Sequence, residues 1–192
     1  MDRIEQLTQA GVRRRAEQLY SQFDSLRQLR REMRREMLAE SRKHPANELL
    51  RQIPRLGPIR VALLIALIQT PHRFRTKRQL WAYCGLGLHT RASGEYSFRE
   101  GQPRHSKRAA APRGLDVNHN HDLKNLFKSA ATHAGPSGDA LGVFYQELLT
   151  QGMKPAMARL TLARKIAAIT LKIWKKGERF NPEHLKRQAA SA

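Results

Sequence analysis

The stretch that decides the fold is Ile53-Pro54-Arg55-Leu56-Gly57-Pro58, which is followed directly by the apolar run Ile59–Ile68. Glycine at 57 allows a tight turn, and proline at 58 suits the first turn of the helix that the apolar run predicts. Glu48–Gln52 predict a short helix before the turn. Two helices joined in this way are typical of a helix-hairpin-helix, in which N–H groups at the start of the second helix bind phosphate oxygens without reading base sequence.

Two arginines flank this turn. Arg55 and Arg60 would add positive charge beside the backbone donors near Gly57. The alternative is a plain turn between two core helices, without any ligand. Both interpretations place the same two helices side by side.

The segments that follow mostly predict further helices. Thr76-Lys77-Arg78-Gln79 has the capping-box pattern of a helix start, and Gly85 fits the position after the end of that helix. Ser137 is expected to cap the second of three later helices, which apolar residues at helical spacing predict over 123–134, 139–150 and 155–176.

A change of period predicts one short β-hairpin between these helices. Apolar and polar residues alternate over 88–92 and 96–99, and Ser93-Gly94 between them suits a two-residue turn. Residues 100–121 contain several glycines and prolines and predict a loop. Cys84, the single cysteine, excludes an internal disulfide and is expected to be a buried small apolar residue.

Residues 1–45 predict one long helix. Their apolar residues recur in alternating steps of four and three between Val12 and Met37, which is heptad spacing with Arg30 as a charged interruption. This stripe, over 12–37, is expected to pair with a second copy in a homo-oligomer. The alternatives are that it folds back on the rest of the chain or continues an upstream segment.

The fold class is therefore mainly α: a long N-terminal coiled-coil-like helix, then a helical domain with a helix-hairpin-helix-like turn and one small β-hairpin. We expect a helical arm over 1–45, a DNA-binding domain over 46–178 and a polar, frayed tail over 179–192.

The charge identifies the class of partner. The chain has 36 Lys and Arg against 16 Asp and Glu, a formal net charge of +20. Such self-repulsion is relieved by a polyanion, and nucleic-acid phosphates fit best because their neutralisation releases condensed counterions. An anionic membrane surface is the rival, but no run of about 18 apolar residues is present, and no signal peptide is apparent at Met1. We therefore expect a cytoplasmic protein without a membrane partner.

A basic loop follows the predicted hairpin. It supplies candidate phosphate contacts at Arg99, Arg104, Lys107, Arg108 and Arg113. Such a run of charge is more often a solvated face, but the net charge favours contact with phosphate. Arg91 lies beside Ser93, whose hydroxyl is a weak nucleophile that needs both a base and cationic groups around the attacked phosphate.

Asn118-His119-Asn120-His121 is the last polar cluster. Its side chains suit phosphates and bases, or a metal ion in a small nuclease. The spacing is weak for a metal, so no metal site is predicted within the chain. The plainer interpretation is an N-cap and a brace for the loop before the next helix.

Several of these pieces together resemble one transposase family. Ile53–Pro58, Phe74–Leu80, Tyr83–Leu86 and Ser93-Gly94 are similar, in order and spacing, to the C-terminal domain of the insertion-sequence family named one-ten. Leu123–Lys128, before Ala130-Ala131, and Ala163–Ile166 in the last helix fit the same domain. The resemblance covers about residues 48–176.

The resemblance implies a function. Members of the family join a resolvase-like domain with four metal-binding acids to a coiled coil and to this domain, and some use a structured guide RNA. Their Ser-Gly motif matches Ser93, which would form a covalent phosphoserine link with DNA. Mg²⁺ is then expected in the full enzyme. The acidic domain is absent from this sequence, so we expect the chain alone to be inactive.

The preferred hypothesis is the C-terminal part of a DNA transposase, with Ser93 as nucleophile. DNA contacts are expected from the turn, the basic loop and the polar cluster, at Arg55, Gly57, Arg60, Arg91, Arg99, Arg104, Lys107, Arg108, Arg113, Asn118, His119 and Lys124. The alternative is a non-catalytic nucleic-acid-binding or regulatory remnant of a transposase.

Overall fold

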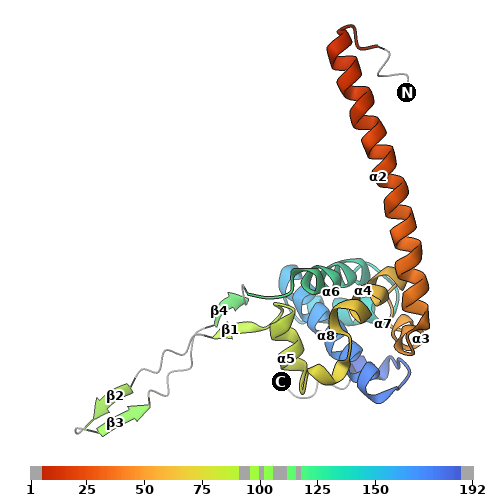
Figure 1. Cartoon of the computed structure of the whole chain (residues 1–192). Helices are drawn as coiled ribbons and strands as arrows, with labels where there is room; N and C mark the ends of the chain where they lie inside the picture. The colour runs from red at the N-terminus through yellow and green to blue at the C-terminus, as the bar shows by residue number, and fades with distance from the viewer. Residues whose placement is uncertain (1–5, 91–95, 100–101, 106–111, 116–117, 187–192) are drawn as a thin grey trace. The chain divides into compact units, whose positions relative to one another are not determined.

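The computed structural model describes residues 6–90, 96–99, 102–105, 112–115 and 118–186. The chain divides into two compact units, residues 1–44 and 45–192. Most described residues are helical, which confirms the mainly α fold class (Figure 1). No helix among these residues is long and apolar enough to cross a membrane.

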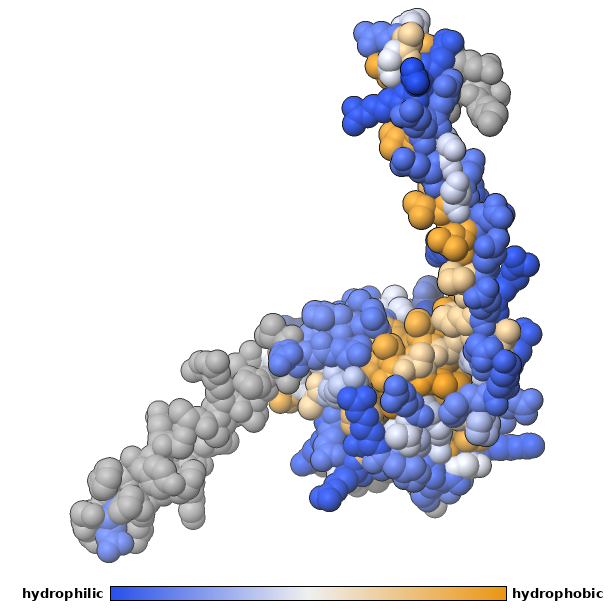
Figure 2. All heavy atoms as spheres, viewed as in Figure 1, coloured by the Kyte–Doolittle hydropathy of each residue, from blue (hydrophilic) through white to orange (hydrophobic). Residues whose placement is uncertain are grey.

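The first unit is dominated by one helix, α2 (Ala10–Lys43). Arginines, glutamates and glutamines occupy most of its surface. Its last turn carries Arg42 and Lys43, whose positive charges interact favourably with the negative C-terminal end of the helix dipole. Figure 2 shows orange apolar side chains along the otherwise blue helix. The long helix predicted from the sequence is therefore present, although it begins at Ala10.

The second unit begins with the predicted pair of helices, α3 (Ala46–Arg51) and α4 (Pro58–Ile68). The short 3-10 helix η1 (Pro71–Arg73) and α5 (Lys77–Tyr83) follow. Thr76 caps α5 by accepting a hydrogen bond from the Gln79 N–H, as the sequence predicts. The Gln79 side chain accepts from Arg75 N–H at 2.6 Å, one residue before the partner expected in a capping box.

Three longer helices complete this unit: α6 (His121–Ala134), α7 (Ala140–Thr150) and α8 (Pro155–Lys176). Pro155 and Gly177 bound α8 as predicted, and Gly177 has the left-handed conformation that favours glycine. Figure 1 shows α8 in blue among the other helices, and it packs against α3, α5, α6 and α7. Leu162, Ile166 and Ile173 of α8 are fully buried in the core.

The predicted pairing of the β-strands is wrong. β1 (Leu88–Thr90) pairs with β4 (Pro112–Leu115), and β2 (Tyr96–Arg99) pairs with β3 (Gln102–His105), both antiparallel. Arg99 lies opposite Gln102, so β2 and β3 form the small hairpin, and β1 and β2 do not pair with each other over the residues that the structure describes. The predicted turn at Ser93-Gly94 lies outside those residues. The local alternation identified the first two strands but carried no information about their partners.

The cap predicted for α7 is also wrong. Asp139, not Ser137, caps this helix by accepting hydrogen bonds from the N–H groups of Leu141 and Gly142. The Ser137 hydroxyl instead donates to Ala134 O at 2.6 Å, at the end of α6. Both residue types are good N-caps, so local preference alone does not decide between them.

The expectation of a frayed tail is wrong for residues 183–186. They form α9 (Glu183–Lys186), which packs against α7, and the Leu185 side chain is only 4% exposed. Lys165 of α8 donates to Leu185 O at 3.1 Å, and burial lowers the pKa of this lysine, with a further contribution from the charge of Lys77. The buried Leu185 side chain and this hydrogen bond thus hold α9 against the core.

We predict that Leu185→Ala lowers the free energy of unfolding by about 2 kcal/mol or more, because it removes a buried side chain from a packed core. Urea unfolding followed by circular dichroism measures the change. The control is Val143→Ala in α7, whose side chain is 52% exposed and should matter little. Equal stabilities of the two variants would show that the tail is not docked.

Candidate nucleic-acid interface

The turn between α3 and α4 has an unusual backbone at Arg55. Its φ of 66° lies in the left-handed region, which glycine adopts readily and other residues adopt at a cost. Gly57 precedes α4 in an extended conformation, and a Cβ built there would meet nothing within 4 Å. The tight turn therefore depends on Arg55 rather than on the glycine.

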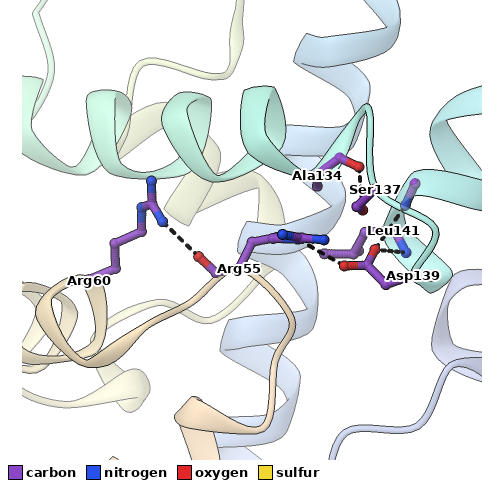
Figure 3. A network of polar contacts seen from close by, with 7 residues as sticks. Arg55, Arg60, Ala134, Ser137, Asp139 and Leu141 are labelled. Atoms are coloured by element: carbon purple, nitrogen blue, oxygen red, sulfur yellow. Dashed lines mark hydrogen bonds and ion pairs between the residues drawn. The ribbon is translucent and has the colours of Figure 1, made fainter.

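Contacts of the Arg55 side chain offset this cost. Its Nε donates to Oδ2 of Asp139 at 2.9 Å, across 84 residues of sequence (Figure 3). Arg60 reaches back from α4 and donates to the carbonyl oxygen of Arg55 at 3.0 Å. Its other guanidinium nitrogens donate to the Ser129 hydroxyl of α6 at 3.3 Å. Both arginines thus join the turn to neighbouring helices.

Asp139 is the central acceptor of this network. Burial raises the pKa of its carboxyl, but hydrogen bonds from the Gly142 N–H and Arg55, together with the positive charge of Arg55, outweigh that effect and lower the pKa below its ordinary value. The carboxylate is therefore ionised under ordinary conditions. It neutralises Arg55 and caps α7 at the same time.

These contacts favour the plainer interpretation of the turn. The guanidinium groups of Arg55 and Arg60 are already bound to protein groups, so they brace the turn against α6 and α7. Their predicted contacts with DNA, and that of Gly57, stay predictions. The sequence did not indicate Asp139 as a site residue, because no local pattern relates it to an arginine 84 positions away.

The predicted nucleophile and much of the basic loop lie outside the described residues. These are Arg91, Ser93, Lys107 and Arg108. The backbone of three other candidates is described, and it is in strands rather than in a loop: Arg99 in β2, Arg104 in β3 and Arg113 in β4. Ser97 of β2 lies opposite Arg104.

His119 lies where the chain returns from the strands to α6. Its ring lies over Gly85, where an added Cβ would come within 2.3 Å of the imidazole, and φ at Gly85 is +61°. Lys124 Nζ lies 3.1 Å from His119 Nε2. Since the ammonium donates, Nε2 accepts, and the ring proton belongs on Nδ1, which is buried without a partner among the described residues.

The rest of the polar cluster is mainly structural. Asn120 caps α6 by accepting from the Leu123 N–H at 3.0 Å, and its own N–H donates to Tyr83 O. The His121 ring packs 4.3 Å from that of His119, between centroids, whereas Asn118 is exposed. The N-cap and brace interpretation is therefore confirmed for Asn120, and contacts of Asn118, His119 and Lys124 with DNA stay predictions.

A metal ion needs acidic, histidine or cysteine side chains arranged around it. Among the described residues, no group of three or more His, Cys, Asp or Glu side chains is arranged to hold a metal ion. His119 and His121 lie together but lack a third such neighbour, and the Lys124 ammonium occupies Nε2 of His119. Cys84 is fully buried, as predicted, and burial raises the pKa of its thiol to about 12.

We predict that Asp139→Ala lowers the free energy of unfolding by about 1–2 kcal/mol, because α7 loses its N-cap as well as the ion pair. Asp139→Asn keeps a good cap and loses only a partly exposed ion pair, so its loss should be below about 1 kcal/mol. Urea unfolding at pH 7 compares the variants, and equal losses would contradict the capping role.

The same carboxylate sets a dependence on pH. Its pKa in the folded chain lies below the ordinary 3.8, so the unfolded chain takes up the proton first as the pH falls. The stability that Asp139 contributes is complete above that ordinary value and is lost below it. Asp139→Asn should therefore lack this part of the acid transition.

Comparison with known proteins covers the turn and the strands. Residues 47–112 match the model of the Transposase IS116/IS110/IS902 family, about one third of the chain, from α3 to the first residue of β4. No curated protein matches the chain. The matched segment contains Ser93, Arg55 and Arg60. The resemblance is thus confirmed over residues 47–112, which carry the sequence pattern of the IS116/IS110/IS902 family of transposases and support a transposase role.

Proposed function

We propose that this chain is the DNA-binding and strand-transfer part of a transposase, with Ser93 as its nucleophile. The observation that carries the proposal is the family match over 47–112, which includes Ser93. DNA is the partner that the match implies, and the net charge of +20 suits its phosphates. A guide RNA would be a second polyanionic partner, as in some members of the family.

The chemistry assigned to Ser93 is an exchange of phosphate esters. Its hydroxyl oxygen forms a bond to a DNA phosphorus, and the bond from that phosphorus to one deoxyribose oxygen breaks. A base moves the serine proton to the leaving oxygen, which departs as an alcohol. The number of phosphate ester bonds is conserved, so the link can be reversed onto a second DNA end without another energy source.

We predict that Ser93→Ala abolishes a covalent protein–DNA adduct while DNA affinity stays within about twofold of wild type. The assay combines the full chain, a family resolvase-like acidic domain, Mg²⁺ and labelled element-end DNA, with adducts resolved on denaturing gels. Ser97→Ala is the matched control, a second serine four residues along the same segment. It should retain the adduct.

Each other outcome has a definite meaning. An adduct that survives Ser93→Ala would remove Ser93 from the chemistry. Wild-type chain that binds DNA but forms no adduct would favour the non-catalytic, regulatory alternative. The affinity of the wild-type chain for DNA should fall steeply as the salt concentration rises, with a slope that corresponds to about six to ten phosphate contacts. Salt-insensitive binding would contradict both interpretations.

The apolar stripe of α2 supports association of two or more copies. Val12, Leu19, Phe23, Leu26 and Met33 are between 46% and 64% exposed. They share one heptad seam, and a seam of this kind is stable in water only when a second helix covers it. Two copies would also bring two Ser93 residues into one assembly, as the joining of two DNA ends requires.

We predict that Leu19→Glu with Leu26→Glu converts a homo-oligomer into a monomer, because two charges would enter the seam. The matched control, Gln18→Glu with Ser25→Glu, places the same charges one position earlier on α2, outside the seam. Sedimentation equilibrium at tens of micromolar measures the mass. A monomeric wild-type chain would contradict association through the seam. Dissociation of both variants alike would contradict it as well.

A further inference from the structure

Two long segments of this basic chain contain no acidic residue. Residues 49–94 lack Asp and Glu entirely, and so do residues 148–177. Ordinary protein surfaces intersperse charges of both signs, which limits self-repulsion. If two such segments meet in the folded chain, the surface that they form together lacks negatively charged side chains.

The fold brings these two segments together. η1 and α5 of the first segment both pack against α8 of the second. Trp81 Nε1 donates to Arg164 O at 2.9 Å, and Arg164 Nε donates to Leu86 O at 2.6 Å. Near the end of α8, Lys175 Nζ donates to the carbonyl oxygens of Phe74 and Arg75. The backbone between η1 and α5 is thus fixed to α8.

Four exposed cations project from this fixed backbone. We call Arg73, Arg75, Lys77 and Arg78 the η1–α5 face; all four residues are exposed. None makes an ion pair with any residue that the structure describes. Lys172 and Lys176, on the neighbouring part of α8, differ because both lie within 4.0 Å of the Glu178 carboxylate.

Aromatic rings hold two of these cations in place. The Arg73 guanidinium lies 4.6 Å from the centroid of Tyr83, and Lys77 Nζ lies 5.6 Å from that of Trp81. Such contacts restrict a long side chain while its charge stays in water. A restricted cation loses less entropy when it binds an anion, so the face is better prepared for phosphate than a set of freely moving lysines.

We propose that the η1–α5 face binds the phosphate backbone of duplex DNA. This face, rather than the turn between α3 and α4, supplies the phosphate contacts, because Arg55 and Arg60 already donate to acceptors within the protein. The choice of duplex DNA rests on the proposed transposase function, and contact through phosphates means that this face positions the duplex without reading its sequence. The face lies within the matched residues 47–112.

The test compares two variants with the same loss of charge in the full chain. Arg75→Gln with Arg78→Gln removes two unpaired cations of the face. Lys172→Gln with Lys176→Gln removes two cations that share the Glu178 carboxylate as an ion-pair partner. Fluorescence anisotropy with a labelled 30-base-pair duplex of arbitrary sequence, over a series of salt concentrations, measures affinity and its salt slope (a duplex length of about three helical turns). Circular dichroism checks that both variants fold.

Loss of two phosphate contacts should lower the salt slope by about 1.8 and weaken binding at least tenfold at low salt in the Arg75/Arg78 variant. The Lys172/Lys176 variant should change the slope by less than half as much. Equal effects of the two variants would overturn the face as a binding site, since only net charge would then matter. Wild-type chain that does not bind duplex DNA would defeat the proposed function itself.

A duplex RNA of the same length supplies the remaining comparison. Tighter binding to RNA, with the whole Arg75/Arg78 effect confined to RNA, would overturn the assignment to DNA. Loss of affinity for the DNA duplex in the Arg75/Arg78 variant would support the assignment to DNA.

Discussion

Burial of α8 is the constraint on which the second unit depends. Its buried residues face several directions rather than one, so that α3, η1, α5, α6 and α7, from several earlier parts of the sequence, all pack against it. Leu162, Ala163 and Ile166 are inaccessible to solvent. Removal of this much apolar surface from water is the main term that favours the folded state. Ala163 and Ala167 are buried in the same core.

Polar contacts then position the surface around this core. The Arg55–Asp139 ion pair joins the turn after α3 to the start of α7, and Arg60 joins the same turn to α6. Lys175 and Trp81 join η1 and α5 to α8. Each of these contacts links segments far apart in sequence, so local charge alone does not tell which cations are available to a ligand. Arginines at the turn donate hydrogen bonds to other helices, whereas Arg73, Arg75 and Arg78 make no ion pair with any described residue.

This division separates the turn from the cations that we propose as phosphate contacts. A helix-hairpin-helix-like turn suggests phosphate binding at its own arginines, but here those arginines stabilise a left-handed residue and a helix cap. The surface formed by η1 and α5 is also basic, and its four cations make no ion pair with any described residue. The turn would then act by holding α4 and its neighbours in position, and the charged face by holding the duplex.

Much of the fold was predictable from local patterns. The sequence alone determined the class, the positions of the main helices, the caps at Thr76, Asn120 and Gly177, and the burial of Cys84, because helix periodicity and capping act within a few residues. It also determined the net charge, which favours a polyanionic partner. Tertiary structure alone decided that β1 pairs with β4, that Asp139 rather than Ser137 caps α7, and that Leu185 anchors the tail. Those outcomes depend on partners tens of residues away, and no local pattern specifies such a partner.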